Sequence, residues 1–307
     1  MDSPGETTFR MKTPIRYAGG KSKAYNKINE HLPFFPKPKR IISPFIGGGS
    51  LEVRWASEQN IPVLGFDVFW VLTNYWKHQI HQGDDLYDIL KDLPCNKSEY
   101  KKVKEELQRW DEVQLLFTDW PTDHYKREPK HIDDLLGAAY YFYNHNLSFG
   151  PAFLGWFSSI YDNEYKKYYR MINRVRDFKC PNLQVEHKSF EEVIPNFPND
   201  LIYLDPPYYM EKDSDNKMFK GLYPNNNWPV HHNDFDHELL RDLLHNHKGS
   251  FILSYNNCET IREYYKDFKQ VFPDWKYSYG QGETRIGKNR TDGKITKESH
   301  EILIIKE

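Results

Sequence analysis

Residues 201–209 read Leu201-Ile202-Tyr203-Leu204-Asp205-Pro206-Pro207-Tyr208-Tyr209, and they predict a strand that ends at a binding site. Its first four, mostly apolar residues are typical of a buried strand. The prolines lack an N–H group and have a fixed φ angle, so the strand cannot continue past Asp205. In open α/β sheets, ligands bind just outside the carboxyl ends of the strands. A carboxylate, a proline carbonyl and an aromatic ring are therefore expected side by side at a binding edge.

These groups indicate a particular kind of ligand. The Asp205 carboxylate and the Pro206 carbonyl can accept hydrogen bonds from an exocyclic amine, and the Tyr208 ring can stack on a flat heterocycle. The alternative interpretation is a plain strand followed by a proline-rich turn. The apolar strand and the tyrosine favour the binding edge over this alternative.

The composition bounds the class of protein. A chain of 307 residues is long enough for one large domain, or for a domain with a sizeable insertion. Its net charge of −2 excludes a strongly basic surface overall, so contact with nucleic acid would need a local basic patch. No apolar run reaches the length of a membrane span, and residues 1–8 lack the apolar core of a signal peptide. We therefore expect a cytoplasmic protein without a membrane partner.

The cysteines and histidines do not form a metal site. Cys95, Cys180 and Cys258 have neither metal-site nor disulfide spacing, which fits a reducing compartment. The histidines gather near His245 and His247, but no set of acids or cysteines joins them at ligand spacing. We expect no metal.

A glycine-rich turn follows an earlier predicted strand. Residues 40–45 form this strand, Ile46-Gly47-Gly48-Gly49-Ser50 the turn, residues 51–59 a helix, and residues 61–67 a second strand that ends in Asp67. Asp67 comes about 20 residues after the glycines, where a Rossmann-type site binds a ribose hydroxyl pair. The turn lacks the G-x-G-x-x-G fingerprint, so an adenosine-bearing ligand without a pyrophosphate fits better than a dinucleotide. The alternative role for Asp67 is a helix N-cap.

Another glycine pair lies near the N-terminus, in Arg16-Tyr17-Ala18-Gly19-Gly20-Lys21-Ser22. The P-loop pattern needs a further, earlier glycine and a preceding strand, and both are missing here. The glycines would still let the backbone approach a ligand closely, between Tyr17 and Lys21. The alternative is a plain loop that opens a helix over residues 23–32.

The middle of the chain, residues 69–180, has almost no strand signal. Its periodicity predicts helices over 85–91, 97–110, 132–146 and 162–178. The last helix is rich in tyrosine and basic residues, including Lys166 and Arg170, and the loop 144–151 before it carries Asn144, Asn146 and Ser148. Such a mixture could grip a phosphate backbone and stack on bases or wedge between them. A helical cap on the sheet with a solvated basic face explains it equally well.

The strand pattern resumes after residue 180. Strands are expected over 183–186, 201–205 and 250–256, with helices over 190–194, 235–247 and 259–267. Residues 270–279 and 301–305 can form a closing antiparallel pair. The basic loop between them, residues 283–297, is either a solvated hairpin or an arm that contacts phosphates through Arg285, Lys288 and Arg290.

The order and spacing of these motifs resemble the Dam-like, alpha-ordered class of DNA adenine-N6 methyltransferases over about residues 13–305. The stretches that carry the resemblance are Arg16–Lys21, Pro44–Ser50, Asp67, Asn144–Gly150, Asp205–Tyr208, Leu253–Asn256 and the final Glu-Ile-Leu-Ile strand. The resemblance implies an α/β fold with a Rossmann-like S-adenosylmethionine-dependent methyltransferase sheet in residues 12–82 and 181–307. It also implies a helical target-recognition insertion in residues 83–180.

The resemblance further implies methyl transfer from S-adenosylmethionine to the N6 amine of a flipped adenine in a short duplex DNA sequence. The catalytic residues would be Asp205, Pro206 and Tyr208. The cofactor would bind at Tyr17, Gly20, Lys21, Phe45, Gly47, Gly49, Ser50, Asp67, Ser189, Phe190 and Asp205. The DNA would contact Asn144, Asn146, Ser148, Lys166, Arg170, Arg285, Lys288 and Arg290.

This chain departs from the family pattern at two positions. The family often has an acid before the phenylalanine that holds the adenine ring of the cofactor, where this chain reads Lys188-Ser189-Phe190. Ser189 or the backbone would then recognise that ring. Tyr17 stands where many relatives have tryptophan, which is a milder change.

Other functions remain open from the sequence. A similar Asp-Pro-Pro-Tyr site could methylate RNA or a protein amide, and an inactive DNA-binding module could retain the fold. The helical insertion and the basic loop favour duplex DNA as the partner. A cognate restriction endonuclease is a further candidate partner, and a monomer is the expected state.

Overall fold

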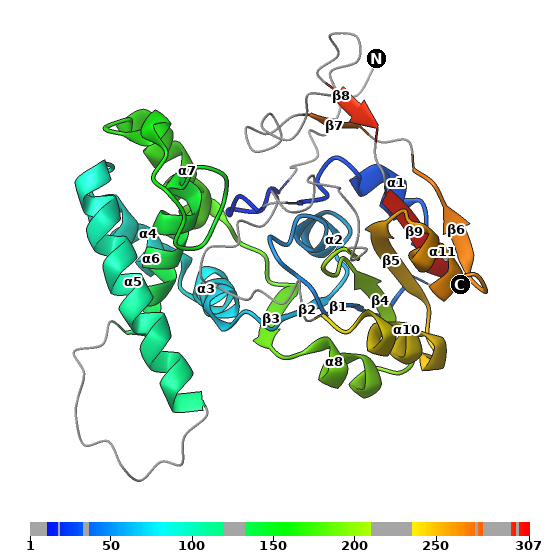
Figure 1. Cartoon of the computed structure of the whole chain (residues 1–307). Helices are drawn as coiled ribbons and strands as arrows, with labels where there is room; N and C mark the ends of the chain where they lie inside the picture. Colours follow the sequence, from blue (N-terminus) through cyan, green and yellow to red (C-terminus); the bar gives the residue numbers. More distant parts are fainter. Residues whose placement is uncertain are drawn as a thin grey trace, which may run out of the picture.

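A sheet of seven strands lies at the centre of the molecule, with helices on both of its faces (Figure 1). The structure is a computed structural model that describes residues 11–17, 19–32, 37–118, 133–209, 235–273, 276–278, 296–298 and 301–307, without the side chains of 111–118, 276–278 and 296–298. The strands follow one another across the sheet in the order β3, β2, β1, β4, β5, β9, β6. Their bounds are β1 Ile41–Ser43, β2 Val63–Asp67, β3 Leu183–His187, β4 Leu201–Leu204, β5 Phe251–Asn256, β6 Lys269–Val271 and β9 Glu301–Lys306.

Strands β1 to β5 run parallel, and β9 runs antiparallel to both of its neighbours. Strand β1 lies between β2 and β4, with Ile41 opposite Val63 on one side and Leu201 on the other. The sheet continues from β1 through β2 to β3 in one direction, and from β4 toward β6 in the other. This reversal is the topological switch point at which open α/β sheets bind ligands. The sheet confirms the predicted α/β fold with a Rossmann-like strand arrangement.

Helices cover the two faces of the sheet because alternate strand residues point to opposite sides. Ile41 belongs to the buried cluster beneath α1 (Tyr25–Asn29), α2 (Glu52–Glu58) and α3 (Trp70–His81). Ile42 belongs to the cluster on the other face, beneath α8 (Phe190–Asn196), α10 (His237–Asn246) and α11 (Glu259–Tyr264). Every residue of β1, β4 and β5 is buried, as expected for strands covered on both faces.

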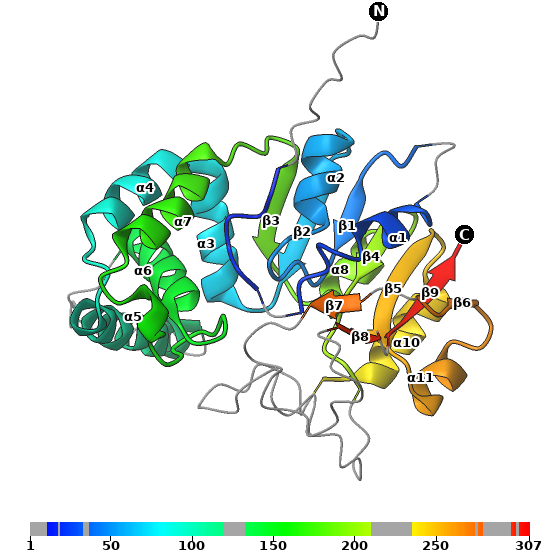
Figure 2. The ribbon, with the colours of Figure 1, turned by 90° about the horizontal axis from the view of Figure 1, so that it is seen from above.

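Four helices form a group beside the β3 edge of the sheet, as the view from above shows (Figure 2). They are α4 Gly83–Asp92, α5 Lys97–Thr118, α6 Asp134–Leu147 and α7 Tyr165–Asp177, and the short 3-10 helix η1 (Ser159–Tyr161) precedes α7. This group packs on α3. The side-chain amide of Gln79 in α3 donates a hydrogen bond to the carbonyl oxygen of Val175 in α7, at 2.9 Å.

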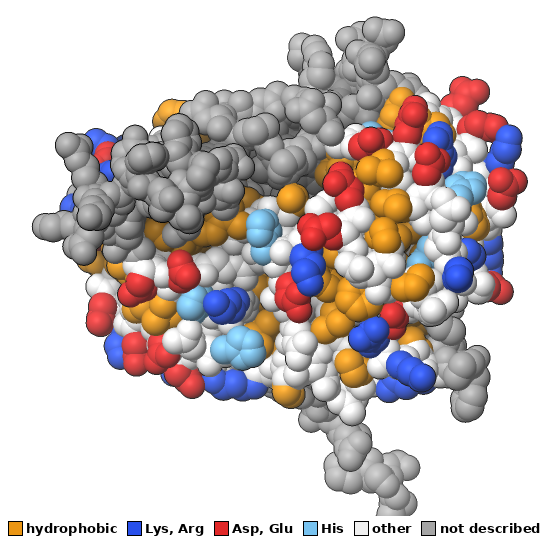
Figure 3. All heavy atoms as spheres, turned by 90° about the horizontal axis from the view of Figure 1, so that it is seen from below, with side chains coloured by type: hydrophobic (Ala, Val, Ile, Leu, Met, Phe, Trp, Pro, Cys, Tyr) orange, Lys and Arg blue, Asp and Glu red, His pale blue; other side chains and the backbone are white. Residues whose placement is uncertain are grey.

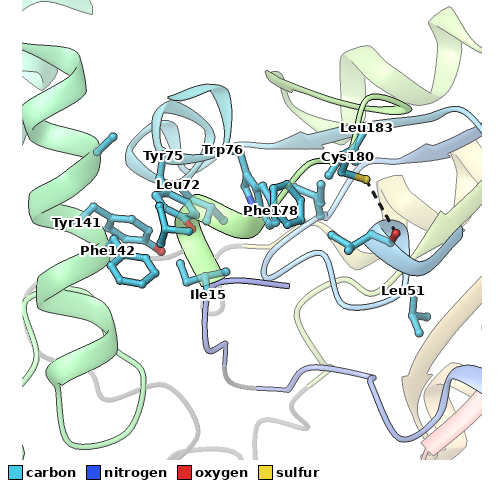
Figure 4. Close-up of a cluster of buried hydrophobic side chains, with 14 of the residues drawn as sticks. Ile15, Leu51, Leu72, Tyr75, Trp76, Tyr141, Phe142, Phe178, Cys180 and Leu183 are labelled. Atoms are coloured by element: carbon cyan, nitrogen blue, oxygen red, sulfur yellow. Dashed lines mark hydrogen bonds between the residues drawn. The ribbon is translucent and has the colours of Figure 1, made fainter. Parts of the chain in front are cut away.

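The hydrophobic core is continuous between the sheet and this helical group (Figure 4). The ring of Tyr75 in α3 stacks on Phe142 of α6, with centroids 5.8 Å apart and planes at 24°. Trp76, one residue further along α3, packs against Phe178 at 6.0 Å. Helix α3 therefore packs on the helical group through buried aromatic rings.

The structure corrects three expectations about the elements. Helix α3 is absent from the predicted helices, because its buried face includes polar residues such as Gln79 that mask the periodicity. The predicted loop over residues 144–151 begins instead with the last turn of α6, which continues through Leu147. The predicted pair of 270–279 with 301–305 is divided: β6 pairs with β9, while β7 (Lys276–Ser278) pairs with β8 (Thr296–Glu298).

Charged side chains are mixed over the face of the molecule seen from below (Figure 3). In the part of this face that is drawn in colour, acidic and basic side chains lie among hydrophobic and neutral ones. Among the described helices, none combines the length and the apolar character that crossing a membrane requires.

Because the core is shared, we expect the sheet and the helical group to unfold together. Phe142 is fully buried, and Phe142→Ala should lower the free energy of unfolding by about 3–5 kcal/mol. Phe272→Ala is the control, since Phe272 is 56% exposed, and should change it by less than about 0.5 kcal/mol. Urea denaturation followed by circular dichroism and by tryptophan fluorescence measures both. Two separate transitions in the wild-type protein would contradict the shared core.

Candidate active site

The carboxylate of Asp205 lies at the carboxyl end of β4 and is bound by the ammonium group of Lys21. Nζ of Lys21 donates to Oδ1 and Oδ2 of Asp205, at 2.9 and 2.8 Å, and to the carbonyl oxygen of Gly19 at 3.2 Å. Lys21 is only 4% exposed, so this ion pair is largely shielded from solvent. The segment with the glycine pair Gly19-Gly20 thus places Lys21 against Asp205, the residue that follows β4.

A second carboxylate, from the far end of the chain, completes this cluster. Glu301 is the first residue of β9, and its Oε1 lies 3.5 Å from Nζ of Lys21. The hydroxyl of Tyr208 donates a hydrogen bond to the same oxygen of Glu301. Nζ of Lys21 also lies 5.2 Å from the centre of the Tyr208 ring. The sequence predicts Glu301 only as the start of a strand, so this contact was missed.

The electrostatics of Asp205 follow from these neighbours. Burial raises the pKa of Asp205 to about 6; Lys21 acts in the opposite direction, and the negative charge of Glu301 adds to the increase. The carboxylate is therefore ionised at neutral pH and becomes protonated in mildly acidic solution. At neutral pH it can accept hydrogen bonds from an amine, as the sequence predicts.

The chain after the two prolines is fixed by Asn256, the last residue of β5. Its side-chain oxygen accepts a hydrogen bond from the Tyr209 N–H, and its amide nitrogen donates to the Tyr209 carbonyl, both at 2.9 Å. Because Pro206 and Pro207 have no N–H groups for strand pairing, these two side-chain bonds fix the position of the segment after them. Asn256 closes the predicted strand 250–256, but its role depends on a neighbour 47 positions away and was not predicted.

The glycine turn after β1 is joined to Asp67 at the end of β2. The Gly47 N–H donates to Oδ2 of Asp67 at 3.1 Å, and the Phe69 N–H donates to Oδ1 at 3.0 Å. Asp67 therefore binds the glycine turn and anchors Phe69, the residue before α3, while its contact with a ribose hydroxyl pair stays a prediction. Gly47 and Gly49 have φ angles of +46° and +61°, which favour glycine.

Tyr17 packs directly on this turn. A Cβ atom at Gly48 would lie 2.4 Å from Cβ of Tyr17, so only glycine leaves room for the tyrosine there. Gly20 approaches Ser50 similarly, because a Cβ atom at Gly20 would lie 3.2 Å from Oγ of Ser50. The N-terminal segment thus lies along the glycine turn, and the two predicted groups of cofactor residues are in contact.

The end of α6 holds the N-terminal segment in place. Asn146 accepts a hydrogen bond from the Arg16 N–H at 3.0 Å, and its carbonyl oxygen accepts one from the Arg16 guanidinium at 3.0 Å. The same guanidinium donates to the Tyr161 hydroxyl at 2.6 Å. His145 hydrogen-bonds to the Arg16 carbonyl at 2.8 Å and stacks on Tyr17. Burial lowers the pKa of His145 to about 4, so the ring is neutral and can accept this packing.

This placement corrects the prediction that Asn144, Asn146 and Ser148 contact DNA. All three side chains are buried. Oδ1 of Asn144 accepts from the Leu154 N–H at 2.7 Å, and Oγ of Ser148 donates to the His145 carbonyl at 2.8 Å. Their hydrogen bonds lie inside the protein because they shape the turn after α6 and hold Arg16.

Aromatic rings line the site beside the glycine turn. Phe45 and Phe190 lie 5.6 Å apart between centroids, and Phe235 contacts both, at 5.7 and 5.1 Å. Oγ of Ser189 accepts a hydrogen bond from the Glu191 N–H at 3.3 Å, so it caps α8. Phe45 and Phe190 are thus brought together as predicted, and Phe235 is a third ring that the sequence did not assign to the site.

A buried acid lies beneath the glycine turn. Oε1 of Glu52 accepts a hydrogen bond from the Ser43 hydroxyl at 2.8 Å, and Oε2 accepts one from the Leu51 N–H at 3.1 Å. Burial raises the pKa of Glu52 to about 7; the two hydrogen bonds act against this increase, and the charge of Asp205 adds to it. The sequence places Glu52 in a helix and does not indicate that it faces the interior.

The predicted basic residues divide into two groups. Lys166 and Arg170 are exposed on α7, where they remain available to a partner. Arg285, Lys288 and Arg290 lie outside the described residues. Among the residues that the structure describes, no three histidine, cysteine or acidic side chains come together as a metal site.

Comparisons with known proteins fit this geometry. A family model for D12 class N6 adenine-specific DNA methyltransferases matches residues 17–279. The chain is also similar to the modification methylase StsI of Streptococcus sanguinis, with 23% identity over 312 residues that cover 96% of this chain and 42% of that relative. The chain thus spans less than half the length of the curated relative.

Glu52 should make the stability depend on pH in a definite direction. Its pKa of about 7 lies above the ordinary value of about 4.3, so between these pH values the folded protein keeps a proton that the unfolded chain loses. The contribution of Glu52 to the free energy of unfolding should therefore fall as pH rises from about 4 to about 7, by at most about 4 kcal/mol.

Urea denaturation of Glu52→Gln across this pH range measures the contribution. The difference in unfolding free energy between variant and wild type should change with pH inside the range and level off outside it. Glu105→Gln, which removes a 53% exposed carboxylate, is the matched control. Parallel curves for wild type and Glu52→Gln would contradict the assignment.

Proposed function

Since this chain belongs to the D12 class N6 adenine-specific DNA methyltransferase family, we propose that it transfers a methyl group from S-adenosylmethionine to the N6 amine of an adenine in a short duplex DNA sequence. One observation carries the proposal. The Asp205-Pro206-Pro207-Tyr208 turn leaves β4 at the switch point, next to the glycine turn that leaves β1. The amine-accepting groups and the adenosine-binding groups therefore share one edge of the sheet.

The residues present fit S-adenosylmethionine. Gly47 and Gly49 adopt backbone angles that allow close approach, Asp67 presents carboxylate oxygens at the end of β2, and Phe45 and Phe190 offer aromatic surface. These residues would hold the adenosine part, with Tyr17 and Lys21 on the methionine side. When bound, the cofactor supplies an electrophilic methyl group on a sulfonium.

The role of Asp205 and Pro206 is to hold the amine that receives the methyl group. The lone pair of the adenine amine is delocalised into the ring, which makes the nitrogen a weak nucleophile. Hydrogen bonds from its two N–H groups to the Asp205 carboxylate and the Pro206 carbonyl favour a tetrahedral nitrogen and stabilise the positive charge that develops on it. Asp205 does not need to be a strong base, because the N–H proton becomes acidic as that charge forms.

The target base has to leave the duplex to reach this edge. Extrusion of a base costs a few kcal/mol. Stacking on the Tyr208 ring, whose hydroxyl is fixed by Glu301, would offset part of that cost. Contacts with the DNA backbone would come from the exposed cations Lys166 and Arg170 and from the aromatic side chain of Trp156, which is 77% exposed on the loop before η1.

Partners and location complete the proposal. The Streptococcus sanguinis relative is named a modification methylase. On that basis we propose a cognate restriction endonuclease as a functional partner for this chain, with both acting on DNA in the cytoplasm and the methyltransferase acting as a monomer. Methylation of RNA or of a protein amide is the alternative, and the same labelled cofactor tests each acceptor.

Asp205→Ala should abolish methyl transfer, because the amine loses its charged acceptor. We expect the single-turnover rate on duplex DNA to fall by about a thousandfold or more, while S-adenosylmethionine and DNA still bind. Mass spectrometry of N6-methyldeoxyadenosine measures the product. Asp88→Ala, at an exposed position on α4, is the control and should keep the wild-type rate. A wild-type rate in Asp205→Ala would reject the proposed site.

Lys166 and Arg170 should account for part of the affinity for DNA. Each phosphate contact contributes about one unit to the slope of log affinity against log salt concentration. Lys166→Ala combined with Arg170→Ala should therefore lower that slope by up to about 2 in a fluorescence-anisotropy titration. Lys266→Ala is the control, because Lys266 follows α11 near the opposite end of the sheet from α7, and it should leave the slope unchanged. Equal slopes for the wild type, the double variant and the control would exclude α7 from the DNA interface.

A further inference from the structure

We propose that Glu301 is a positioning residue, which receives the Lys21 ammonium when the target amine takes its place on Asp205 and which fixes the Tyr208 ring beside them. This inference rests on the proposed function, since it concerns the same site. It assigns a role to the first residue of β9, which lies far in sequence from the residues it serves.

The first observation is that Lys21 binds the group that must accept the amine. Its Nζ contacts both carboxylate oxygens of Asp205, at 2.9 and 2.8 Å. An amine donor can therefore form its hydrogen bond to Asp205 in the proposed geometry only if Lys21 gives up part of this contact. The exchange is local, because Oε1 of Glu301 already lies 3.5 Å from the same nitrogen.

The second observation is burial. Lys21 is 4% exposed and Glu301 is 9% exposed, so an ammonium that moves away from Asp205 cannot turn to water. A buried charge without a partner costs several kcal/mol. Glu301 avoids this cost, because the cation can move between two carboxylates and remain paired throughout.

The third observation is the phenol of Tyr208. Its hydroxyl donates to the Glu301 oxygen that faces Lys21. The ring lies 5.2 Å from Nζ of Lys21 and packs near Tyr255 at 6.2 Å. The Glu301 carboxylate thus lies beside the Lys21 ammonium and also fixes the orientation of the Tyr208 ring, which is expected to stack on the target base.

The charges that face Asp205 come from several elements. Lys21 faces it from the N-terminal segment, Glu301 from β9 and Glu52 from α2, while Tyr203 and Tyr208 are phenols of the same strand and turn. Among these, Glu301 raises the pKa of Asp205 and Lys21 lowers it. Removing the charge of Glu301 should therefore move the protonation of Asp205 to lower pH.

Glu301→Gln separates a positioning role from a structural one. At pH 8 the single-turnover rate of methyl transfer to duplex DNA should fall about tenfold to a hundredfold, because Lys21 stays on Asp205 and the Tyr208 ring is less well held. The affinities for S-adenosylmethionine and for DNA, measured by calorimetry and by anisotropy, should stay within about twofold of wild type. The acidic limb of kcat/KM against pH should move to lower pH.

A readout that does not depend on activity accompanies these kinetics. In protein labelled with 13C at the aspartate carboxyl carbons, NMR follows the titration of Asp205, and Asp205→Asn identifies its signal. The midpoint should be near pH 6 in the wild type and lower in Glu301→Gln. Glu301→Asp retains the charge and should restore the wild-type midpoint and part of the rate, and it also serves as the test if Glu301→Gln does not fold.

Glu307→Gln is the matched control, because Glu307 immediately follows β9 and forms an exposed pair with Lys269 at 3.0 Å. It should match the wild type in rate and in midpoint. A wild-type rate and midpoint in Glu301→Gln, with an active wild-type enzyme, would overturn the role of Glu301. Absence of methylated adenine from the wild-type reaction would instead overturn the proposed function, so the two failures are distinguishable.

Discussion

Strands β1 and β4 lie side by side and parallel, and this pairing is the constraint on which the site depends. Both strands are short and completely buried, and each is followed directly by a segment of the candidate site. The sheet continues in opposite directions from them, so the glycine turn and the Asp205–Tyr208 turn meet at one edge. The N-terminal segment then lies across this edge, with Gly20 against Ser50 and Lys21 on Asp205.

Among the residues that the structure describes, the buried charged groups at this edge are mostly acidic, which suits the proposed cofactor. Asp205, Glu301 and Glu52 contribute carboxyl groups, and Lys21 contributes an ammonium. Burial and mutual repulsion raise the pKa of Asp205 to about 6 and that of Glu52 to about 7, so the folded protein holds these acids at some cost in stability. A ligand that carries a sulfonium would reduce this repulsion, and binding would then stabilise the fold by mass action.

The sequence predicted the parts of the site that are encoded locally. The apolar run before Asp205, the prolines after it, and the glycines followed by Asp67 indicate a strand, its end and a turn without any knowledge of distant neighbours. Glu301 and Asn256 could not be predicted, because their roles arise from the pairing of β9 with β5 and from contacts across the sheet edge. Asn144 and Asn146 were predicted to lie on the surface, because they are polar and precede a basic helix in the sequence. In the structure they are buried and accept hydrogen bonds from the backbone N–H groups of Leu154 and Arg16.

The position of β9 in the sheet has a consequence for synthesis of the protein on the ribosome. This strand is made after β5 and β6, yet it lies between them and contributes Glu301 to the cluster around Lys21. A nascent chain can therefore form the parallel half of the sheet early, but its edge cannot close until residues 301–306 have left the exit tunnel. Any stop codon upstream of residue 301 would give a product without this closing strand, however much of the rest were made.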